Sequence, residues 1–195
     1  MRDASEPGAL PTPGGPRVRL LDADSAPLLV RDHFAGGDPG PIVASLAQVP
    51  ELVGPTLPFL GAVLGPSWIP LREKEIVILR TSAVMGCRYC TDTHTVVALD
   101  SGLGRDEVRA LRGDLPVAGA FSDAYERALI SWCDAVAFGI ESDIRPARAA
   151  LDADDARVVE LTLLVATTVM LNRYATALGL PVSVDARARL AEEAL

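Results

Sequence analysis

Apolar residues recur along the chain at intervals of three and four positions, which is the spacing of one face of an α-helix. No stretch shows the sustained alternation of β-branched and polar residues that is typical of a half-buried strand. Glycine and proline residues separate the apolar stretches and mark their ends. We therefore predict an all-α fold.

The predicted helices carry residues that favour helix ends. Pro41 and Pro70 suit first-turn positions, and Ser122 and Asp154 suit N-cap positions. Five glycines are expected to end helices in the left-handed conformation: Gly86, Gly102, Gly113, Gly139 and Gly179. The predicted helices cover residues 25–34, 41–48, 50–64, 70–85, 87–101, 105–112, 123–138, 143–151, 155–178 and 184–194.

The amino-terminal residues differ in composition from the rest of the chain. Residues 1–16 include four prolines and three glycines, a composition typical of a flexible arm. We expect residues 17–195 to form a single all-helical domain. A chain of 195 residues that is 49% hydrophobic can bury one substantial core.

The charge of the chain argues against one class of partner. The formal net charge is -8, and lysine and arginine are not clustered. A nucleic-acid surface needs clustered positive charge. We therefore predict no nucleic-acid partner.

The longest apolar stretch, 158–171, contains Glu160 and is shorter than the roughly 20 residues that a membrane-spanning helix needs. We expect a buried helix there and no membrane partner. The first residues lack a basic segment that leads into an apolar stretch, so no secretory signal is predicted. A cytoplasmic location is expected.

The candidate chemistry concentrates in the segment that follows Gly86. Cys87, Cys90 and His94 are three and four residues apart, so on a helix their side chains project along one stripe. Two thiols so placed can cycle between dithiol and disulfide if one of them is a thiolate near neutral pH. A helix N-terminus and an adjacent imidazole both favour the thiolate. The spacing therefore indicates redox chemistry.

A carboxylate on the preceding predicted helix completes the set of candidate residues. Glu75 shares a helix face with Leu71 and Ile78, so we expect it to be partly buried and able to act as an acid or base. The break at Gly86 lets the next helix fold back. That fold-back would bring Glu75 toward His94.

The combination of Glu75, eleven intervening residues, Cys87-x-x-Cys90, three residues and His94 resembles the signature of alkylhydroperoxidase D-like (AhpD-like) proteins. These proteins belong to the carboxymuconolactone decarboxylase superfamily. The likeness is strongest at 70–104 and spans roughly residues 40–183. Further segments that share it are 96–103 and, more weakly, 171–173 and 178–181.

The resemblance implies an all-helical protein that forms a trimer or hexamer and reduces hydroperoxides. It implies that Cys90 attacks the peroxide and that Cys87 is the resolving thiol that closes the disulfide. It also implies that His94 and Glu75 form the proton relay that activates Cys90. The implied reductant is a lipoyl-bearing protein or another dithiol. No cofactor and no bound metal are predicted.

A zinc site is one alternative, with Cys87, Cys90 and His94 as ligands and His33, Cys133 or Glu75 as the fourth ligand. Structural zinc sites usually draw on two ligand pairs, and the chain has no second Cys-x-x-Cys. The zinc alternative is therefore disfavoured. Cys133 lies in an apolar predicted helix and is expected to be an inert core thiol.

Two further alternatives concern function. One is a carboxymuconolactone decarboxylase-like lyase that uses His94 and Glu75 as acid and base, although such proteins generally lack the paired cysteines. The other is a redox sensor, or a member recruited to specialised metabolism, without peroxidase turnover.

Overall fold

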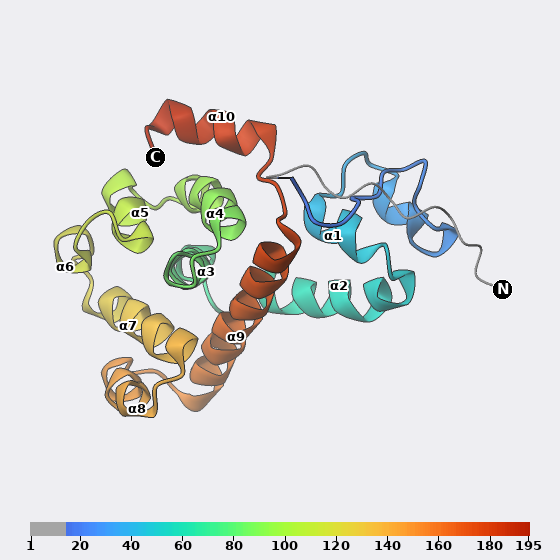
Figure 1. The fold of residues 1–195 in the computed structure, drawn as a ribbon. Helices are drawn as coiled ribbons and strands as arrows, with labels where there is room; N and C mark the ends of the chain where they lie inside the picture. The colour runs from blue at the N-terminus through green and yellow to red at the C-terminus, as the bar shows by residue number, and fades with distance from the viewer. Residues whose placement is uncertain (1–14) are drawn as a thin grey trace.

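The computed structural model describes residues 15–195, and over these residues it contains helices and no β-strand (Figure 1). The predicted all-α fold is confirmed. Apart from residues 15 and 16, the flexible arm predicted at 1–16 lies outside the described residues. The elements are the 3-10 helix η1 (Leu28–Phe34) and the α-helices α1 (Pro41–Leu46), α2 (Pro50–Leu64), α3 (Leu71–Val84), α4 (Arg88–Asp100), α5 (Arg105–Arg112), α6 (Val117–Ala120), α7 (Ala124–Phe138), α8 (Glu141–Ala150), α9 (Asp155–Leu178) and α10 (Val184–Glu193).

Most helix ends follow the predicted signals. Pro41 begins α1 as predicted, whereas Pro70 is the N-cap of α3 and not a first-turn residue. The five glycines have φ between 63° and 92°, and Asp154 caps α9 as predicted. The prediction of Ser122 as an N-cap was wrong, because the carboxylate of the next residue, Asp123, accepts the Tyr125 N–H at 2.7 Å. The short helix α6 was not predicted, because its four residues are too few to show a helical period.

Helix α3 lies at the centre of the fold, where it contacts α4, α5, α7 and α9 (Figure 1). Its residues Ile76, Val77 and Leu79 are fully buried in the main apolar core. Leu161 and Leu164 of α9 belong to the same core. The main core therefore forms around α3 and fixes the helices that carry the candidate site.

Helix α9 has the ends predicted for it, 155–178, and extends beyond the apolar stretch at 158–171 on both sides. It has 24 residues and is long and apolar enough, by length and composition, to cross a membrane. In the fold, however, it packs against α2, α3, α4 and α7. Its burial is confined to one face, because Val159, Leu163 and Met170 are exposed. Helix α9 is therefore a core helix with an apolar outer stripe.

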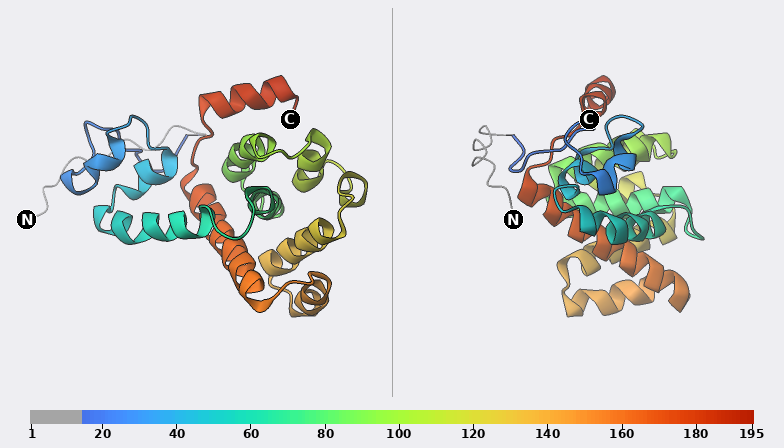
Figure 2. Two further views of the ribbon diagram at one scale, coloured as in Figure 1. Left: turned by 180° about the vertical axis from the view of Figure 1, so that it is seen from behind. Right: turned by 90° about the vertical axis from the view of Figure 1, so that its right-hand side faces the viewer.

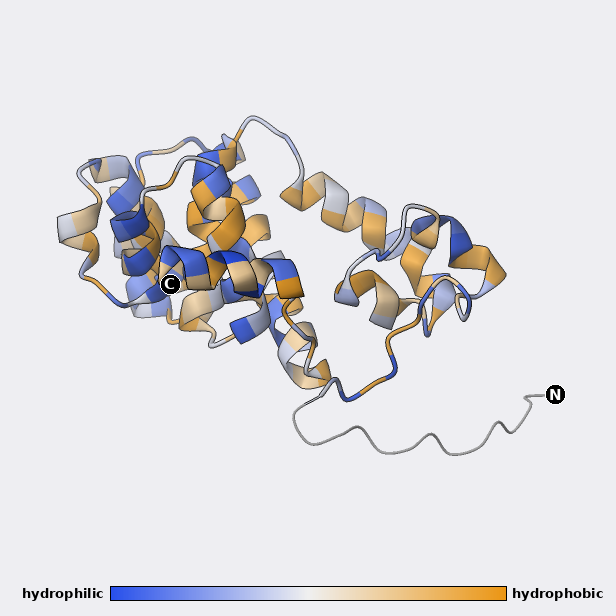
Figure 3. Ribbon diagram, turned by 90° about the horizontal axis from the view of Figure 1, so that it is seen from above, coloured by the Kyte–Doolittle hydropathy of each residue, from blue (hydrophilic) through white to orange (hydrophobic). Residues whose placement is uncertain are grey.

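A second, smaller apolar cluster lies near the amino-terminal end of the described chain. It contains Val30 and Phe34 of η1, Ala44 and Ala47, and Val53 of α2. Helices α1 and α2 lie on the opposite side of α9 from α5, α6 and α7 (Figure 2). Figure 3 shows hydrophobic residues in both groups of helices. Helix α9 thus separates the two groups.

A buried cation fixes the connection between α2 and α3. Lys74 is only 1% exposed, and its Nζ donates to the carbonyl oxygens of Val63 (3.0 Å) and Gly65 (2.5 Å) at the end of α2. Glu160 of α9 lies 3.7 Å from the same nitrogen. A buried ammonium group requires such partners. Lys74 therefore anchors the start of α3 directly beside Glu75.

Candidate active site

The turn between α3 and α4 positions the two motif cysteines. Gly86 has a φ of 67°, in the left-handed region that favours glycine, and lets the chain reverse after α3. The Cys87 N–H donates to the carbonyl oxygen of Ser82 (3.0 Å). Cys87 is the N-cap of α4, and Cys90 lies in the first turn of that helix. Helix α4 packs along α3, as the break at Gly86 predicts.

This fold-back brings together two predicted site residues from different helices. Glu75 Oε2 and His94 Nδ1 are 2.9 Å apart. The Glu75 side chain is 4% exposed, whereas that of His94 is 26% exposed. A carboxylate at Nδ1 orients the imidazole ring and leaves Nε2 as the nitrogen that exchanges protons. The expected approach of Glu75 to His94 is confirmed, and its geometry suits proton transfer.

Cys87 and Cys90 are free thiols with relative exposures of 1% and 6%. The backbone N–H of Cys90 donates to Cys87 Sγ at 3.4 Å. His94 lies one helical turn beyond Cys90 on α4. The structure thus places all four predicted site residues on two packed helices, while their separate roles stay predictions.

The two thiols have opposite ionisation properties. The side-chain hydrogen bond from Cys90 lowers the pKa of Cys87 to about 6, against the effect of burial. The Cys90 N–H, Thr176 and Asn172 add smaller contributions in the same direction. The hydrogen bond with Cys87, followed by burial, raises the pKa of Cys90. Near neutral pH the pair therefore shares one proton, with the negative charge on Cys87.

Two chain segments cover the thiols. Leu180 follows α9, and Leu20 precedes η1, and both pack in the apolar cluster that contains the cysteines. The segment with Leu20 is held by Arg17, whose N–H donates to Leu178 O (2.7 Å) and whose guanidinium donates to Thr176 O (2.7 Å). Because the thiols are almost fully buried, a substrate reaches the sulfur atoms only when this cover moves.

A hollow of about 270 Å³ adjoins the cysteine motif and is lined by Tyr89, Arg88 and residues of the segment after α9. Tyr89 also packs in the thiol cluster. Burial, followed by the negative charge of the neighbouring thiols, raises the pKa of Tyr89 to about 12. Tyr89 is therefore a neutral hydroxyl beside the pair at physiological pH.

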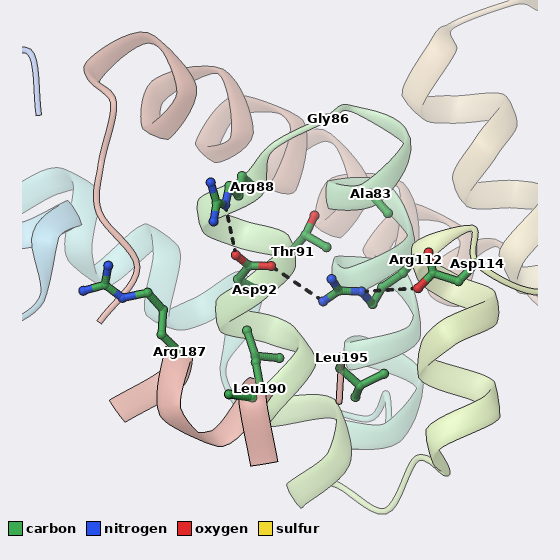
Figure 4. Close-up of a pocket in the computed structure, with 11 residues that line it drawn as sticks. Ala83, Gly86, Arg88, Thr91, Asp92, Arg112, Asp114, Arg187, Leu190 and Leu195 are labelled. Carbon is green, nitrogen blue, oxygen red and sulfur yellow. Dashed lines mark ion pairs between the residues drawn. The ribbon is translucent and has the colours of Figure 1, made fainter. Parts of the chain in front are cut away.

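A larger hollow of about 570 Å³ lies between α4, α5 and α10 (Figure 4). A chain of ion pairs runs along it from Arg88 to Asp92, from Asp92 to Arg112 and from Arg112 to Asp114 (Figure 4). Neither cysteine lines this hollow. Its volume is thus separate from the thiol site.

The described residues offer little for a metal ion. Within 15–195, no group of three or more histidine, cysteine, aspartate or glutamate side chains is placed to hold one. His33 is exposed on η1, and Cys133 belongs to the main core, whereas Cys87 and Cys90 form a separate cluster. Neither His33 nor Cys133 therefore supplies a fourth ligand for the zinc alternative.

Two groups near the thiols were missed by sequence reasoning. Asn172 of α9 lies beside the pair, and its segment, 171–173, showed the weaker family likeness that could have drawn attention to it. Arg17 and Leu20 also contribute to the thiol surroundings. No pattern in the sequence pointed to them, because they reach the site only through the tertiary fold.

Comparison with family models gives one match. Residues 50–130 match the model described as the carboxymuconolactone decarboxylase family. This segment contains Glu75, Cys87, Cys90 and His94. Among curated proteins, none matches the chain.

Solved structures with similar folds include two proteins described as peroxidase-related. A protein from Ralstonia eutropha, described as an alkylhydroperoxidase AhpD core, has a TM-score of 0.73 at 17% identity, over 88% of this chain and 94% of its own. A protein from Silicibacter sp. has a TM-score of 0.70 at 18% identity, over 94% of this chain and 97% of its own. At such identities the likeness shows the fold alone.

A third similar structure is that of a debrominase. Debrominase Bmp8, crystallised as a cysteine-to-alanine variant with 2,3,4-tribromopyrrole, has a TM-score of 0.67 at 19% identity. The likeness covers 94% of this chain and 98% of the debrominase. The same fold therefore also serves a reaction other than peroxide reduction.

Proposed function

We propose that the chain is an AhpD-like member of the carboxymuconolactone decarboxylase superfamily, and that it is a thiol-dependent peroxidase that reduces hydroperoxides through Cys87 and Cys90. The observation that carries this proposal is the combination of a dithiol at the α4 N-terminus with His94 one turn further along α4, where Glu75 of α3 contacts its imidazole. A lone dithiol lacks a group that protonates the leaving hydroxyl, and a lone Glu–His pair lacks an electron source. The combination supplies both.

The reaction begins with attack of Cys90 Sγ on the terminal oxygen of the hydroperoxide. The O–O bond breaks, the alcohol leaves with one proton, and a sulfenic acid forms on Cys90. Cys87, which already bears the negative charge of the pair, can pass the proton that Cys90 loses to the departing alkoxide oxygen, so Cys87 is again a thiolate for the second step.

The second step closes the disulfide. The Cys87 thiolate attacks the Cys90 sulfur, and the hydroxyl group leaves as water with a proton that His94 supplies. Glu75 stabilises the protonated imidazole through Nδ1. Overall, the singly charged thiol pair, one hydroperoxide and the proton from His94 give one disulfide, one alcohol and one water, so the two electrons come from the thiol sulfurs.

The reductant that returns the disulfide to the dithiol is proposed to be a lipoyl-bearing protein or another dithiol, by analogy with the family. We also propose a cytoplasmic homo-oligomer, a trimer or hexamer. The exposed apolar stripe of α9, with Val159, Leu163 and Met170, supports assembly. Light scattering of the purified protein tests it, and a monomer at micromolar concentration would contradict it.

The decisive experiment combines thiol titration with intact-mass analysis, before and after one equivalent of an organic hydroperoxide. We expect the wild-type protein to lose two thiols and two mass units. The Cys87→Ser variant should retain a trappable sulfenic acid on Cys90, and Cys133→Ser serves as the matched control with wild-type behaviour. Full peroxide turnover by Cys90→Ser would defeat the proposed roles, and thiols that stay reduced would defeat the peroxidase.

The debrominase likeness supports a second electron acceptor, a halogenated aromatic compound. The same dithiol could reduce a carbon–halogen bond, giving the dehalogenated compound, a halide ion and the disulfide. Offering tribromopyrrole and cumene hydroperoxide to the same reduced protein separates the two substrates. Disulfide formation with the halide compound alone would favour the dehalogenase.

The Glu75–His94 pair also supports the lyase alternative, since it needs no thiol. Replacing both Cys87 and Cys90 separates this alternative from the redox proposals. Retained conversion of a carboxymuconolactone by the double variant would favour the lyase. If reduced protein forms the disulfide with peroxide but does not turn over with any dithiol, the redox-sensor alternative gains support.

A further inference from the structure

Asn172 is a buried amide that faces the thiol pair from α9. Its side chain lies on the same helix face as Ala175 and Thr176, three and four residues further on. Ala175 packs in the cluster that contains Cys87 and Cys90. Asn172 itself is 1% exposed. This amide therefore belongs to the wall of the thiol site.

The Asn172 amide is tied to the turn that carries Cys87. Its Nδ2 donates to Ser82 Oγ at 3.0 Å. The carbonyl oxygen of Ser82 in turn accepts the Cys87 N–H at 3.0 Å. The Asn172 side chain also contributes to lowering the pKa of Cys87 and opposes the rise in the pKa of Cys90. An amide nitrogen carries two N–H groups, so one can hold Ser82 while the other faces sulfur.

The oxygen atom of the Asn172 amide gives a second argument. Asn172 Oδ1 is buried and has no hydrogen-bond partner among residues 15–195. A buried acceptor without a donor costs stability, and an apolar side chain of similar size avoids that cost. Packing alone therefore does not account for an amide at this position. Hydrogen-bond donation by its N–H groups does account for it.

The charge on Cys87 is held mainly by neutral donors. The Cys90 thiol lowers the pKa of Cys87 most, burial opposes it, and the Cys90 N–H, Thr176 and Asn172 lower it further. Other titratable and charged groups also lie around the pair. They are Tyr89 and Tyr174 in the same cluster, His94 of α4 with Glu75 of α3, the exposed Arg88, and Arg17, which donates to the α9 carbonyl oxygens. Loss of one neutral donor should therefore raise the pKa of Cys87.

We propose that Asn172 is a positioning residue of the thiol pair, whose amide holds the α3–α4 turn through Ser82 and donates its second N–H to the Cys87 sulfur. This inference rests on the proposed redox use of Cys87 and Cys90, but not on hydroperoxide as the substrate. The charge on sulfur is lost when the disulfide forms. Asn172 therefore stabilises the reduced, singly charged pair relative to the disulfide.

The test measures the rate of iodoacetamide alkylation of the reduced full-length protein as a function of pH. We expect Asn172→Asp, which removes the N–H donors and adds a negative charge, to move the midpoint upward by about one pH unit or more, equivalent to at least about fivefold slower alkylation at pH 6. Asn172→Leu removes the donors without adding charge, so a smaller upward shift is expected.

Two matched variants separate this role from packing. Thr167→Val changes another buried α9 residue whose hydroxyl also has no partner among the described residues, and its midpoint should match the wild type. Ser82→Ala removes the contact to the turn but keeps the amide beside sulfur, and should shift the midpoint less than Asn172→Leu. An unchanged midpoint in Asn172→Leu would overturn the proposal, whatever the outcome of the peroxide assay.

A measurement on the wild-type protein covers the case in which the Asn172 variants fail to fold. The side-chain ¹⁵N resonance of Asn172 should titrate with the same midpoint as the thiol pair. In folded Cys87→Ser protein that transition should disappear. A resonance that does not respond between pH 5 and 8 would overturn the hydrogen bond to the charged sulfur.

Discussion

Cys87 and Cys133 are equally buried, yet the structure gives them opposite chemical properties. Their exposures are 1% and 0%, and both lie on or beside helices that pack against α3. Cys87 caps the N-terminus of α4, where hydrogen-bond donors surround its sulfur. Cys133 lies within α7, where burial raises its pKa. Burial by itself therefore does not determine whether a cysteine is reactive.

The difference comes from the helix terminus and the donors. The N–H groups of the first turn of a helix have no intrahelical acceptors, so a sulfur at the N-cap can accept one of them. A cysteine in the middle of a helix meets N–H groups that are already bonded. The surroundings of Cys87 thus stabilise a thiolate, whereas Cys133 is packed in the apolar core.

The largest expected effect is a direct contrast between the two cysteines. At pH 7, iodoacetamide should label Cys87 at least about 100-fold faster than Cys133, because a thiol with a raised pKa is less than about 1% ionised at that pH. Site-resolved mass spectrometry measures both rates in one sample. In denaturant the rates should converge, and equal rates in the native protein would show that the contrast is wrong.

Removal of the Glu75 charge tests whether turnover by the thiol pair also needs proton transfer by Glu75 and His94. In Glu75→Gln the hydrogen bond to His94 can persist, but the charge that stabilises the imidazolium is lost. We expect kcat/KM for hydroperoxide reduction to fall between about 10- and 100-fold, in the range of general acid–base catalysis. The exposed Glu51→Gln is the control. A Glu75→Gln rate within twofold of wild type would remove Glu75 from the relay.

The pH dependence sharpens the contrast. Because the pKa of Cys87 is lowered to about 6, its thiolate is present above that pH and is lost as the pH falls through it. Alkylation of the pair should therefore rise about tenfold from pH 5 to pH 7. Cys133 should show no rise over the same range. A midpoint near 8.5 for Cys87 would mean that the α4 N-terminus leaves the thiol unperturbed.

The smallest expected effect concerns the cover over the thiols. Arg17→Ala removes the side-chain hydrogen bonds to the end of α9. A loss of about 1 kcal/mol would raise the population with an open cover, and thus the rate of reaction with a bulky disulfide reagent, about fivefold. The neighbouring Arg19→Ala is the control, since Arg19 uses its backbone carbonyl to bind Gln48. Equal rates in both variants would show that this segment does not limit access.

The local features of this protein were readable in the sequence. Helical periodicity predicted α2, α5 and α9 with the observed ends, and the glycines at α3, α5, α7 and α9 adopt the expected left-handed conformation. The spacing of Cys87, Cys90 and His94 placed them on one helix. These features depend on interactions within a few residues, which local composition encodes.

Errors arose where neighbouring residues had equal local preferences. Ser122 and Asp123 are both good N-cap residues, and only the path of the chain after Phe121 decides that Asp123 accepts the first N–H groups of α7.

Only the tertiary structure decided what surrounds the thiols. The contact of Glu75 with His94 requires α4 to pack along α3, and the cover by Arg17 and Leu20 joins residues more than 150 positions apart in sequence to the end of α9. Asn172 reaches Ser82 in the same way. By itself the sequence determined the helices and the spacing of the reactive groups. Burial, the shared proton and access to sulfur were decided by long-range packing, because these properties depend on which distant side chains exclude water from the site.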